Sequence, residues 1–320
     1  MNTILVTGCA GFIGSHVCSL LLAKGFRVIG VDNFDLFYER SVKEKNMESF
    51  ISHHNFVFYE ADICDGLGQV KEKNIDAVIH LAAKAGVRPS IDDPEGYIRC
   101  NITGTQQVHD FMKSQDIHKM VFASSSSVYG NNIKTPFSET DNVDNPISPY
   151  AFTKKACELM NYTFHHLYKK DIINLRFFTV YGPRQRPDLA IHKFVHKISK
   201  DEPLHLFGDG KTARDYTFID DTVTGIINAL TYCLNNSNLY ETLNLGNNRP
   251  VTLKELVSII YKEMDKKENV VYEEMQPGDV EITYADITSA NKLINYNPRI
   301  DINDGIKRFV HWYYSENKSE

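Results

Sequence analysis

Thr-Ile-Leu-Val-Thr-Gly-Cys-Ala-Gly-Phe-Ile-Gly, residues 3–14, is the stretch that decides the fold of this chain. The apolar run 3–6 indicates a buried strand, and the apolar spacing over 12–24 indicates a helix that stops at Gly25. Between them stand the glycines that a tight turn and close helix packing require, Gly8, Gly11 and Gly14. A helix that starts at such a turn presents unpaired N–H groups and a partial positive charge, which predicts a phosphate-binding site.

A carboxylate follows this turn at the distance expected for a dinucleotide-binding unit. The second predicted strand covers 26–31 and ends at Asp32, 18 residues after Gly14. An acidic side chain there can accept hydrogen bonds from both ribose hydroxyls of an adenosine, and it would repel a 2′-phosphate. The pattern therefore favours NAD over NADP as the cofactor.

Strands and helices alternate along the first part of the chain. Further strands are expected at 56–58, 77–81, 120–124 and 173–178, and helices at 97–114 and 150–169. This alternation is typical of βαβ units. The predicted fold class is α/β, a doubly wound parallel sheet of the Rossmann type with a smaller C-terminal α/β region that binds substrate.

The character of the sequence changes after residue 178. A loop rich in charge and helix breakers, a helix and a strand are expected in turn at 182–188, 191–200 and 204–207. We expect an NAD-binding Rossmann domain over 1–178 and a substrate-binding region over 179–320. Two stretches of the second region are expected to return to the first domain, 220–235 and 242–244.

Composition and charge limit the class of protein. Of 320 residues, 42% are hydrophobic and 24% are charged, as in ordinary globular proteins, and the net charge of −6 argues against a general nucleic-acid surface. The six cysteines form no C-x-x-C pair and have no histidine at zinc spacing, so we expect reduced thiols, a cytoplasmic protein and no metal site. The chain has no run of about 18 apolar residues, so no membrane span is expected.

Tyr150 and Lys154 stand four residues apart in a predicted helix and therefore share one face of it. A run of serines, 124–127, follows the strand 120–124 at the carboxyl edge of the predicted sheet, where open α/β sheets bind ligands. Oxidation of a sugar hydroxyl requires removal of its proton. An ordinary tyrosine, with a pKa of about 10, is a weak base, but a nearby ammonium group favours the phenolate. We therefore expect Tyr150, Lys154 and Ser125 to be catalytic, with the serine hydrogen-bonded to the reacting oxygen.

Together these motifs resemble the extended short-chain dehydrogenase/reductases that act on nucleotide sugars, the NAD-dependent epimerase/dehydratase family. Further matching segments are 62–63, 81–83, 101–105, 176–183 and 214–220. The resemblance covers about residues 3–290 in the order of the family. It implies a homodimer formed through the helices at 97–114 and 150–169, with no nucleic-acid or membrane partner.

The resemblance also implies a role for each matching residue. NAD contacts are implied at Gly8, Gly11, Phe12, Ile13, Gly14, Asp32, Asn33, Asp62, Ile63, Leu81, Ala82, Ala83, Lys84, Asn101, Tyr150, Lys154 and Phe178. Contacts to a UDP-sugar are implied at Arg88, Ser125, Ser126, Ser127, Tyr150, Thr179, Arg186, Arg214 and Asp279. The chain departs from the UDP-galactose epimerases at Gln276, where those enzymes carry an arginine three residues before the Asp279 position.

The serine run limits what can follow oxidation at C4. The 4,6-dehydratases of the family carry an Asp-Glu pair at the positions of Ser126 and Ser127, and the UDP-glucuronate decarboxylases carry a glutamate at the position of Ser127. Hydroxyl groups supply no acid or base for a second reaction. The resemblance therefore implies that the hydride returns to C4, and a 4-keto sugar that rotates first becomes the C4 epimer.

Three segments favour a uronate as the sugar, since 85–88, 179–190 and 276–280 resemble the UDP-glucuronate 4-epimerases. Arg88 and Arg186 are candidate partners for its carboxylate by charge. The expected reaction is the NAD-dependent conversion of UDP-glucuronate to UDP-galacturonate by an isomerase.

Three alternatives stay open at this point. The small Thr283 also leaves room for UDP-glucose or UDP-N-acetylglucosamine as the substrate of a 4-epimerase. A UDP-glucuronate decarboxylase is the second alternative, although Ser127 argues against it. The third, from another class, is a regulator that senses NAD(P) without catalysis.

Overall fold

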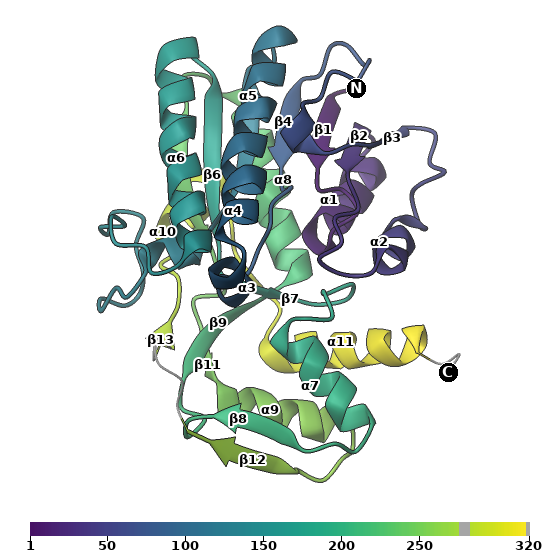
Figure 1. The fold of residues 1–320 in the computed structure, drawn as a ribbon, viewed down its shortest axis with the longest axis vertical. Coiled ribbons are helices and arrows are strands. Elements are labelled where there is room, and N and C mark those ends of the chain that lie inside the picture. The colour runs from purple at the N-terminus through teal and green to yellow at the C-terminus, as the bar shows by residue number, and fades with distance from the viewer. Residues whose placement is uncertain (275–281, 318–320) are drawn as a thin grey trace.

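The computed structural model describes residues 1–274 and 282–317. Its central sheet has seven parallel strands in the order β10-β6-β5-β4-β1-β2-β3 (Figure 1). In chain order they are β1 Thr3–Thr7, β2 Arg27–Asp32, β3 Phe56–Glu60, β4 Ala77–His80, β5 Lys119–Ser125, β6 Asp171–Phe177 and β10 Tyr240–Leu245. The six strands that come first in the sequence, β1 to β6, lie in the order of a doubly wound dinucleotide-binding sheet. This order confirms the predicted fold class.

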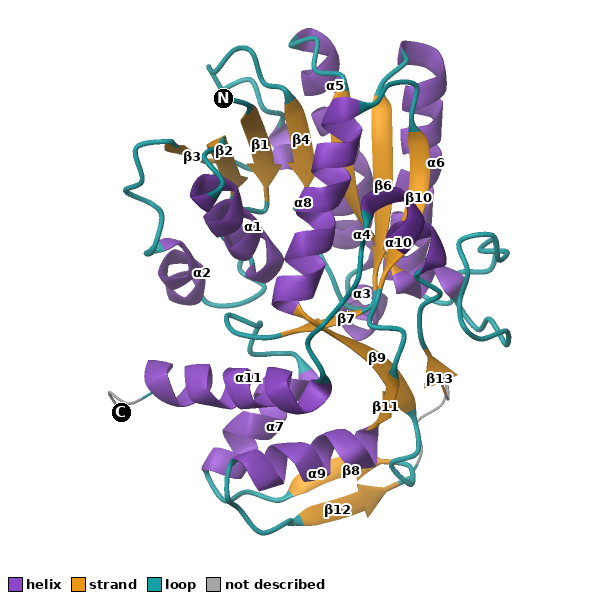
Figure 2. Ribbon diagram, turned by 180° about the vertical axis from the view of Figure 1, so that it is seen from behind, coloured by secondary structure: helices purple, strands orange, loops and turns teal. Residues whose placement is uncertain are grey.

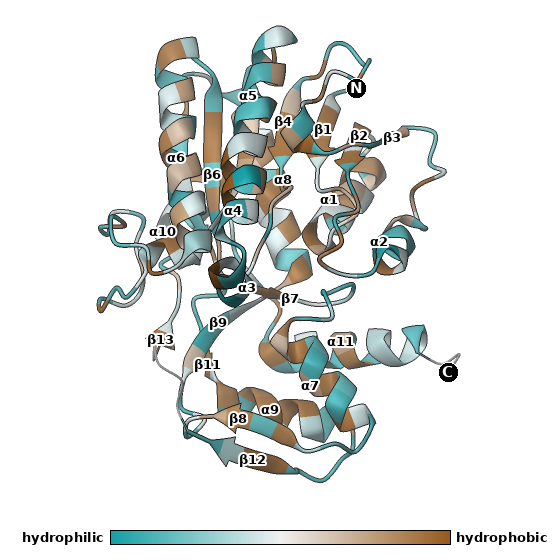
Figure 3. Cartoon of the chain, in the orientation of Figure 1, coloured by the Kyte–Doolittle hydropathy of each residue, from teal (hydrophilic) through white to brown (hydrophobic). Residues whose placement is uncertain are grey.

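Helices cover both faces of this sheet. In Figures 1 and 2, α1 Phe12–Ala23 and α8 Ile219–Asn235 lie on one face, and α5 Gly104–Ser114 and α6 Pro149–Tyr168 lie on the other. Successive side chains of β1 enter the two separate cores, with Ile4 in one and Leu5 in the other. Figure 3 shows the result as apolar strands between helices whose outer surfaces are more polar.

The expected strands and helices of the first part lie within two residues of the observed ones, with one correction. The helix expected at 97–114 is interrupted, because α4 Pro94–Tyr97 and α5 are joined by a π-helical turn, η2 Ile98–Thr103. Within η2, the Asn101 carbonyl accepts the Thr105 hydroxyl at 2.6 Å, so side chains satisfy a backbone group at the irregular turn. The short helix α2 Arg40–Met47 was not expected, because its sequence is almost entirely polar.

A smaller α/β region lies below the sheet in Figure 1. It contains α7 Ala190–Ser199, β8 Leu204–Phe207, α9 Leu253–Glu263, β12 Val270–Glu273 and α11 Ile302–Glu316. Between the two regions, β9 Ala213–Phe218 pairs with β7 Thr179–Tyr181, β11 Pro250–Thr252 and β13 Ile282–Thr283. Both α8 and β10 pack into the main sheet region from beyond residue 178. None of the helices in the described part of the chain is long and apolar enough to span a membrane.

A buried ion pair fastens α6 to the sheet. The Glu158 carboxylate accepts two hydrogen bonds from the Arg176 guanidinium, at 2.9 and 2.8 Å, and one from the Ser124 hydroxyl at 2.7 Å. The guanidinium also lies 4.8 Å from the ring centre of Tyr129. Because Ser124 directly precedes the predicted catalytic serine, this pair holds the end of β5 against the helix that carries Tyr150.

The substitution Glu158→Ala is expected to lower the free energy of unfolding by about 3–5 kcal/mol, because it leaves the Arg176 guanidinium buried without its carboxylate. Urea denaturation followed by circular dichroism measures this loss. The matched control Lys266→Ala removes the more exposed pair with Asp201 and should cost less than about 1 kcal/mol. Equal, small losses for both variants would contradict the role given to Glu158.

Candidate functional site: a cavity at the carboxyl edge of the sheet

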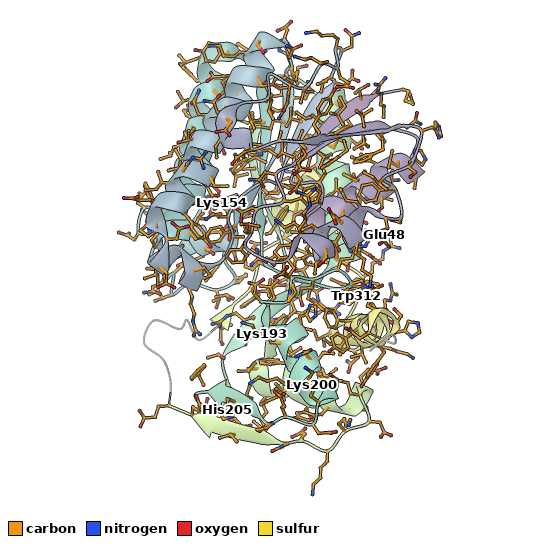
Figure 4. The ribbon with its side chains drawn as sticks, turned by 45° about the vertical axis from the view of Figure 1, so that its right-hand side comes forward. Glu48, Lys154, Lys193, Lys200, His205 and Trp312 are labelled. Atoms are coloured by element: carbon orange, nitrogen blue, oxygen red, sulfur yellow. The ribbon has the colours of Figure 1, made fainter. Side chains whose placement is uncertain are left out.

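A cavity of about 530 Å³ opens along the carboxyl ends of the parallel strands. Its wall includes Gly8 after β1, Asp32 at the end of β2, Leu81 after β4, Ser125 at the end of β5 and Phe177 at the end of β6. This is the edge at which open α/β sheets bind ligands. Lys154, labelled in Figure 4, belongs to the wall on the α6 side.

The glycine turn leaves no room for side chains where α1 meets β1. A Cβ on Gly14 would lie 1.9 Å from the Gly8 carbonyl oxygen, and a Cβ on Gly8, which has a φ of +74°, would lie 2.8 Å from the Ala82 nitrogen. Gly11 stands at the N-cap of α1 and has no side chain to bond the first N–H groups of the helix. These groups are therefore available to an anion in the cavity.

Asp32 faces this turn with a fixed geometry. One carboxylate oxygen accepts the Ala10 N–H at 3.1 Å, and the other accepts the Phe34 N–H at 2.9 Å. The side chain is 8% exposed, and burial raises the pKa of its carboxyl group, against the lowering effect of the Phe34 N–H. The carboxylate is thus preorganised to receive the hydroxyls of a ribose.

Lys43 is one cation near Asp32, and Arg40 is another candidate to bind a 2′-phosphate, because it contacts Glu60, which pairs with Asp32 in the sheet. Its guanidinium donates to Glu60 through two nitrogens, at 2.7 and 2.8 Å, and to Glu44 through its Nε at 2.7 Å. Three hydrogen bonds to two carboxylates neutralise this arginine. The geometry beside Asp32 therefore favours a cofactor with a free 2′-hydroxyl.

The expected catalytic residues come together on two elements. Ser125 ends β5, where its hydroxyl accepts the Ser127 N–H at 3.2 Å and donates to the Ser127 hydroxyl at 3.0 Å. Tyr150 lies in the first turn of α6, which Ser148 caps by accepting the Ala151 N–H at 3.1 Å. The Lys154 ammonium, one turn later, donates to the carbonyl of residue 123 at 2.7 Å, so it joins α6 to β5.

In a buried polar network behind the cavity, the donor and the acceptor of each hydrogen bond can be assigned in one consistent way. Thr105 donates to the Asn101 carbonyl at 2.6 Å, so its oxygen accepts from His80 Nε2–H at 3.0 Å. Thr7 accepts the Ala82 N–H at 3.2 Å and donates to His80 Nδ1 at 2.7 Å. Burial holds the pKa of His80 well below its usual range, so the imidazole stays neutral in this one tautomer.

Asn101 extends this network to the catalytic helix. Its amide oxygen accepts the Lys84 N–H at 2.8 Å, and its amide nitrogen donates to the Lys84 carbonyl and to the Thr153 hydroxyl. Thr153 in turn donates to the Tyr150 carbonyl at 2.8 Å. Asn101 is therefore placed behind the wall, where it fixes Lys84 and the start of α6.

The loop after β7 carries Arg186 into the cavity wall. Its guanidinium forms a bidentate pair with Asp188, at 2.9 and 2.8 Å, and lies 4.9 Å from the ring centre of Phe37. Arg88, in α3 Val87–Asp92, instead lies over the ring of Phe207 at 5.8 Å. Of the two arginines considered for a sugar carboxylate, the cavity wall includes Arg186.

Most of the expected site residues line this one cavity. They are Gly8, Gly11, Phe12, Ile13, Gly14, Asp32, Asn33, Asp62, Ile63, Leu81, Ala82, Ala83, Lys84, Ser125, Ser126, Ser127, Tyr150, Lys154, Phe178, Thr179 and Arg186. Among the described residues, those expected but absent from its wall are Arg88, Asn101 and Arg214. Asp279 and Gln276 lie outside the described residues.

Sequence reasoning missed a group of wall residues that precede or enter α2, namely Phe37, Tyr38 and Lys43. Lys43 is 5% exposed, lies 4.6 Å from the ring centre of Tyr38 and donates to the Asp35 carbonyl at 2.6 Å. Burial lowers the pKa of its ammonium group, against the raising effect of Asp32. The only available signal was a lysine and two aromatics soon after Asp32, which no motif distinguishes from a surface loop.

Comparison with known proteins identifies relatives of this chain. Residues 5–309 match the family described as GDP-mannose 4,6 dehydratase. A UDP-glucuronate 4-epimerase from Thermodesulfobacterium geofontis (strain OPF15) is 43% identical over 316 residues, which cover 98% of this chain and 96% of that protein. A crystal structure of UDP-glucuronic acid 4-epimerase from Bacillus cereus, in complex with UDP-glucuronic acid and NAD, aligns with a TM-score of 0.92 at 35% identity, over 98% of this chain and 99% of that one.

A second similar solved structure is a 4-epimerase named for a different sugar. UDP-N-acetylglucosamine 4-epimerase from Methanobrevibacter ruminantium M1, in complex with UDP-N-acetylmuramic acid, aligns with a TM-score of 0.90 at 31% identity, over 98% of this chain and 99% of that one. Fold and cavity define a dinucleotide-binding α/β enzyme. The chain belongs to the GDP-mannose 4,6 dehydratase family, whose members are NAD-dependent epimerases and dehydratases, as its motifs predicted.

The substitution Gly14→Ala is expected to weaken NAD binding by about tenfold or more, equivalent to about 1.4 kcal/mol. The new methyl group would meet the Gly8 carbonyl oxygen at 1.9 Å, and backbone cannot move aside without displacing α1. Isothermal titration calorimetry with NAD measures the effect. Gly68→Ala is the matched control, since its Cβ meets no atom within 4 Å, and an equal loss in both variants would refute this explanation.

Proposed function

We propose that this protein is an NAD-dependent UDP-sugar 4-epimerase that converts UDP-glucuronate to UDP-galacturonate. One observation carries the proposal: Tyr150, Lys154 and Ser125 line the same cavity as Ser126 and Ser127, which offer hydroxyls where the dehydratases of the family carry carboxylates. The nearly full-length similarity to proteins named UDP-glucuronate 4-epimerase supports the choice of sugar.

The cavity fits NAD in its backbone and its charge. The N–H groups at the start of α1 would hold the pyrophosphate, and Asp32 would hold the adenosine ribose. A Cβ would fill the space between Gly8 and Gly14. Glycines at these positions let the backbone approach a bound pyrophosphate closely. When bound, NAD supplies a reversible hydride acceptor for the carbon at C4 of the sugar.

We assign the proton transfer to Tyr150. Its phenolic oxygen would take the proton of the C4 hydroxyl as the hydride leaves, and would return the proton when the 4-keto sugar is reduced from its other face. The Lys154 ammonium lies one turn further along α6, and the Ser125 hydroxyl would steady the charge that develops on the C4 oxygen. The wall near these groups carries small side chains, Gly86, Ser126, Thr179 and Ala190, which leave space for the sugar to rotate.

A 4-keto uronate is a β-keto acid, so the site must prevent loss of CO₂ during the rotation. Decarboxylation requires the carboxylate bond to align with the carbonyl π system, and small changes in geometry alter such rates strongly. We propose that the Ser127 and Thr179 hydroxyls restrain the carboxylate together with Arg186. Because Asp188 already engages the Arg186 guanidinium, the hydroxyls are expected to provide much of this restraint.

The remaining substrate contacts are proposed on the second region. Arg214, on β9, stands two residues before Tyr216, which lines the cavity, and we propose that it contacts the diphosphate. Asp279 is proposed to contact the uridine ribose. Arg88 is not part of the cavity wall, so its role as a carboxylate partner passes to Arg186 in this proposal.

We further propose a homodimer that forms through α6. Three large apolar side chains on its outer surface are exposed, Phe152 at 45%, Leu159 at 57% and Tyr162 at 53%. Their spacing of seven and three residues aligns them along one stripe of the helix. A contiguous apolar stripe on an otherwise polar surface is typical of a protein interface.

We also propose a cytoplasmic location. The six cysteines are all unpaired thiols, and four of them are buried. Disulfides are rare in the reducing cytosol, so a chain with six free thiols suits that compartment.

The first test follows UDP-glucuronate by NMR with the purified protein and no added NADH. UDP-galacturonate should accumulate with little pentose product. The substitution Tyr150→Phe should lower the rate by about 10²–10⁴-fold because it removes the general base. Tyr314→Phe, on the exposed face of α11, is the matched control and should keep the rate. Dominant release of UDP-pentose would instead identify a decarboxylase, and conversion of UDP-glucose alone would exclude the uronate.

The dimer is tested with Leu159→Glu, which places a charge in the apolar stripe of α6. Sedimentation velocity should show a dimer for the unaltered protein and a shift toward monomer for this variant. Leu36→Glu alters a side chain that is 91% exposed elsewhere and should leave the dimer unchanged. A monomer in the unaltered protein would rule out the proposed interface.

A further inference from the structure

Two cysteines that are far apart in the sequence come together at the wall of the cavity. Cys64 lies in the turn η1 Ile63–Asp65, directly after β3, and Cys100 lies in the π-helical turn η2. Both are partly exposed, whereas Cys9, Cys18, Cys157 and Cys233 are buried. The two turns pack against each other, so this is the accessible thiol pair of the chain.

The surroundings of Cys64 direct its sulfur toward Cys100. The Cys64 thiol donates to the carbonyl oxygen of Arg99 at 3.5 Å, and Arg99 is the residue immediately before Cys100. Gly104 lets η1 pack closely on α5, since a Cβ there would lie 2.6 Å from the Ile63 side chain, whereas the Cys64 sulfur at 3.6 Å would be in ordinary contact. The turn η1 thus packs closely on the helical segment that carries Cys100.

The two thiols differ in reactivity. Cys100 lines the cavity, and the neighbouring Cys64 thiol lowers the pKa of its thiol, with help from the Lys84 N–H and the positive charge of Lys154, against the raising effect of burial. The neighbouring Cys100 thiol, together with burial and Asp62, raises the pKa of the Cys64 thiol. Because the thiolate is the nucleophile, Cys100 is the residue that reacts first, and Cys64 is placed to resolve the product.

We propose that Cys64 and Cys100 form a disulfide when the protein meets a peroxide. We also propose that a cofactor bound in the cavity controls the access of peroxide to Cys100. The proposal rests on the proposed function in one respect, since the cofactor that covers Cys100 is the NAD assigned to this cavity.

The chemistry needs only the two thiols and hydrogen peroxide. The Cys100 thiolate attacks one peroxide oxygen, the O–O bond breaks, hydroxide leaves and Cys100 becomes a sulfenic acid. The Cys64 sulfur then attacks the Cys100 sulfur, the S–O bond breaks, and the departing oxygen takes up a proton and leaves as water. The pair of thiols loses two electrons and the peroxide gains them. A dithiol reductant reverses the change.

A disulfide here would alter the adenosine side of the cavity. Asp62 and Ile63, which immediately precede Cys64, line the wall, and Asn101, which immediately follows Cys100, fixes the backbone of Lys84. A bond between the two sulfurs draws these segments together and narrows the space between them. Oxidised protein should therefore bind NAD more weakly, and bound NAD should shield Cys100 from peroxide.

The experiment treats the purified protein with hydrogen peroxide, with and without saturating NAD, and maps disulfides by mass spectrometry of non-reduced peptides. The bound NAD of every sample is measured, so that protection is judged per site filled. We expect a Cys64–Cys100 link that forms several-fold more slowly in the NAD-filled protein. The oxidised form should bind NAD at least about tenfold more weakly, and dithiothreitol should restore binding.

Variants separate the roles of the two thiols. Cys64→Ser should accumulate the Cys100 sulfenic acid, detected with dimedone, without forming the link, and its NAD affinity should resist peroxide. Cys100→Ser should leave Cys64 reduced, while the four buried cysteines serve as internal controls. Absence of the link, a link to another cysteine, or equal rates with and without bound NAD would overturn the proposal. Disulfide mapping requires no turnover, so this outcome is independent of whether the protein epimerises UDP-glucuronate.

Discussion

The contact between Gly8 and Gly14 is the constraint on which the rest of the site depends. Because no Cβ separates them, a turn of four residues is enough to join β1 to α1, and the first N–H groups of the helix face the cavity. The same helix, α1, also contacts the loop after β7 that carries Arg186 into the cavity wall. The His16 side chain lies 2.9 Å from the Pro183 carbonyl, and burial lowers the pKa of this histidine to about 4, so a neutral imidazole donates the hydrogen bond. One helix thus sets the positions of the two halves of the cavity.

The catalytic tyrosine is positioned from the opposite side by polar groups rather than by apolar packing alone. A continuous chain of hydrogen bonds runs from Thr7 through His80 and Asn101 to the carbonyl of Tyr150. Each hydrogen bond in this chain has one direction, so the arrangement tolerates no alternative tautomer of the histidine. Such a network is fully satisfied and buried, and it fixes the start of α6 relative to the strand that leads into the glycine turn.

Sequence reasoning reached the sheet and the motif residues because their causes are local. The apolar run of β1, the glycines after it and the Tyr150–Lys154 spacing each dictate their own structure. It did not reach the π-helical turn at Ile98–Thr103, because that turn depends on hydrogen bonds made with Lys84 and Thr153, which are distant in sequence. It did not reach Lys43 either, since a lysine in a polar helix becomes part of a cavity wall only when the sheet places it there. The pairing of Arg186 with Asp188 was missed for a different reason, since the two residues are near in sequence but their side chains meet only in the conformation of this loop.

The edge strand β10 has a consequence for how this chain is made. Its six residues, Tyr240–Leu245, complete the first sheet by pairing with β6, and α8 just before it covers one face of that sheet. A ribosome that has released the chain through β6, but not yet α8 and β10, has therefore exposed β6 as an unpaired edge beside an apolar face that α8 does not yet cover. Such surfaces attract other chains. We therefore expect the nascent chain to be most prone to association with other chains between the release of β6 and the arrival of β10.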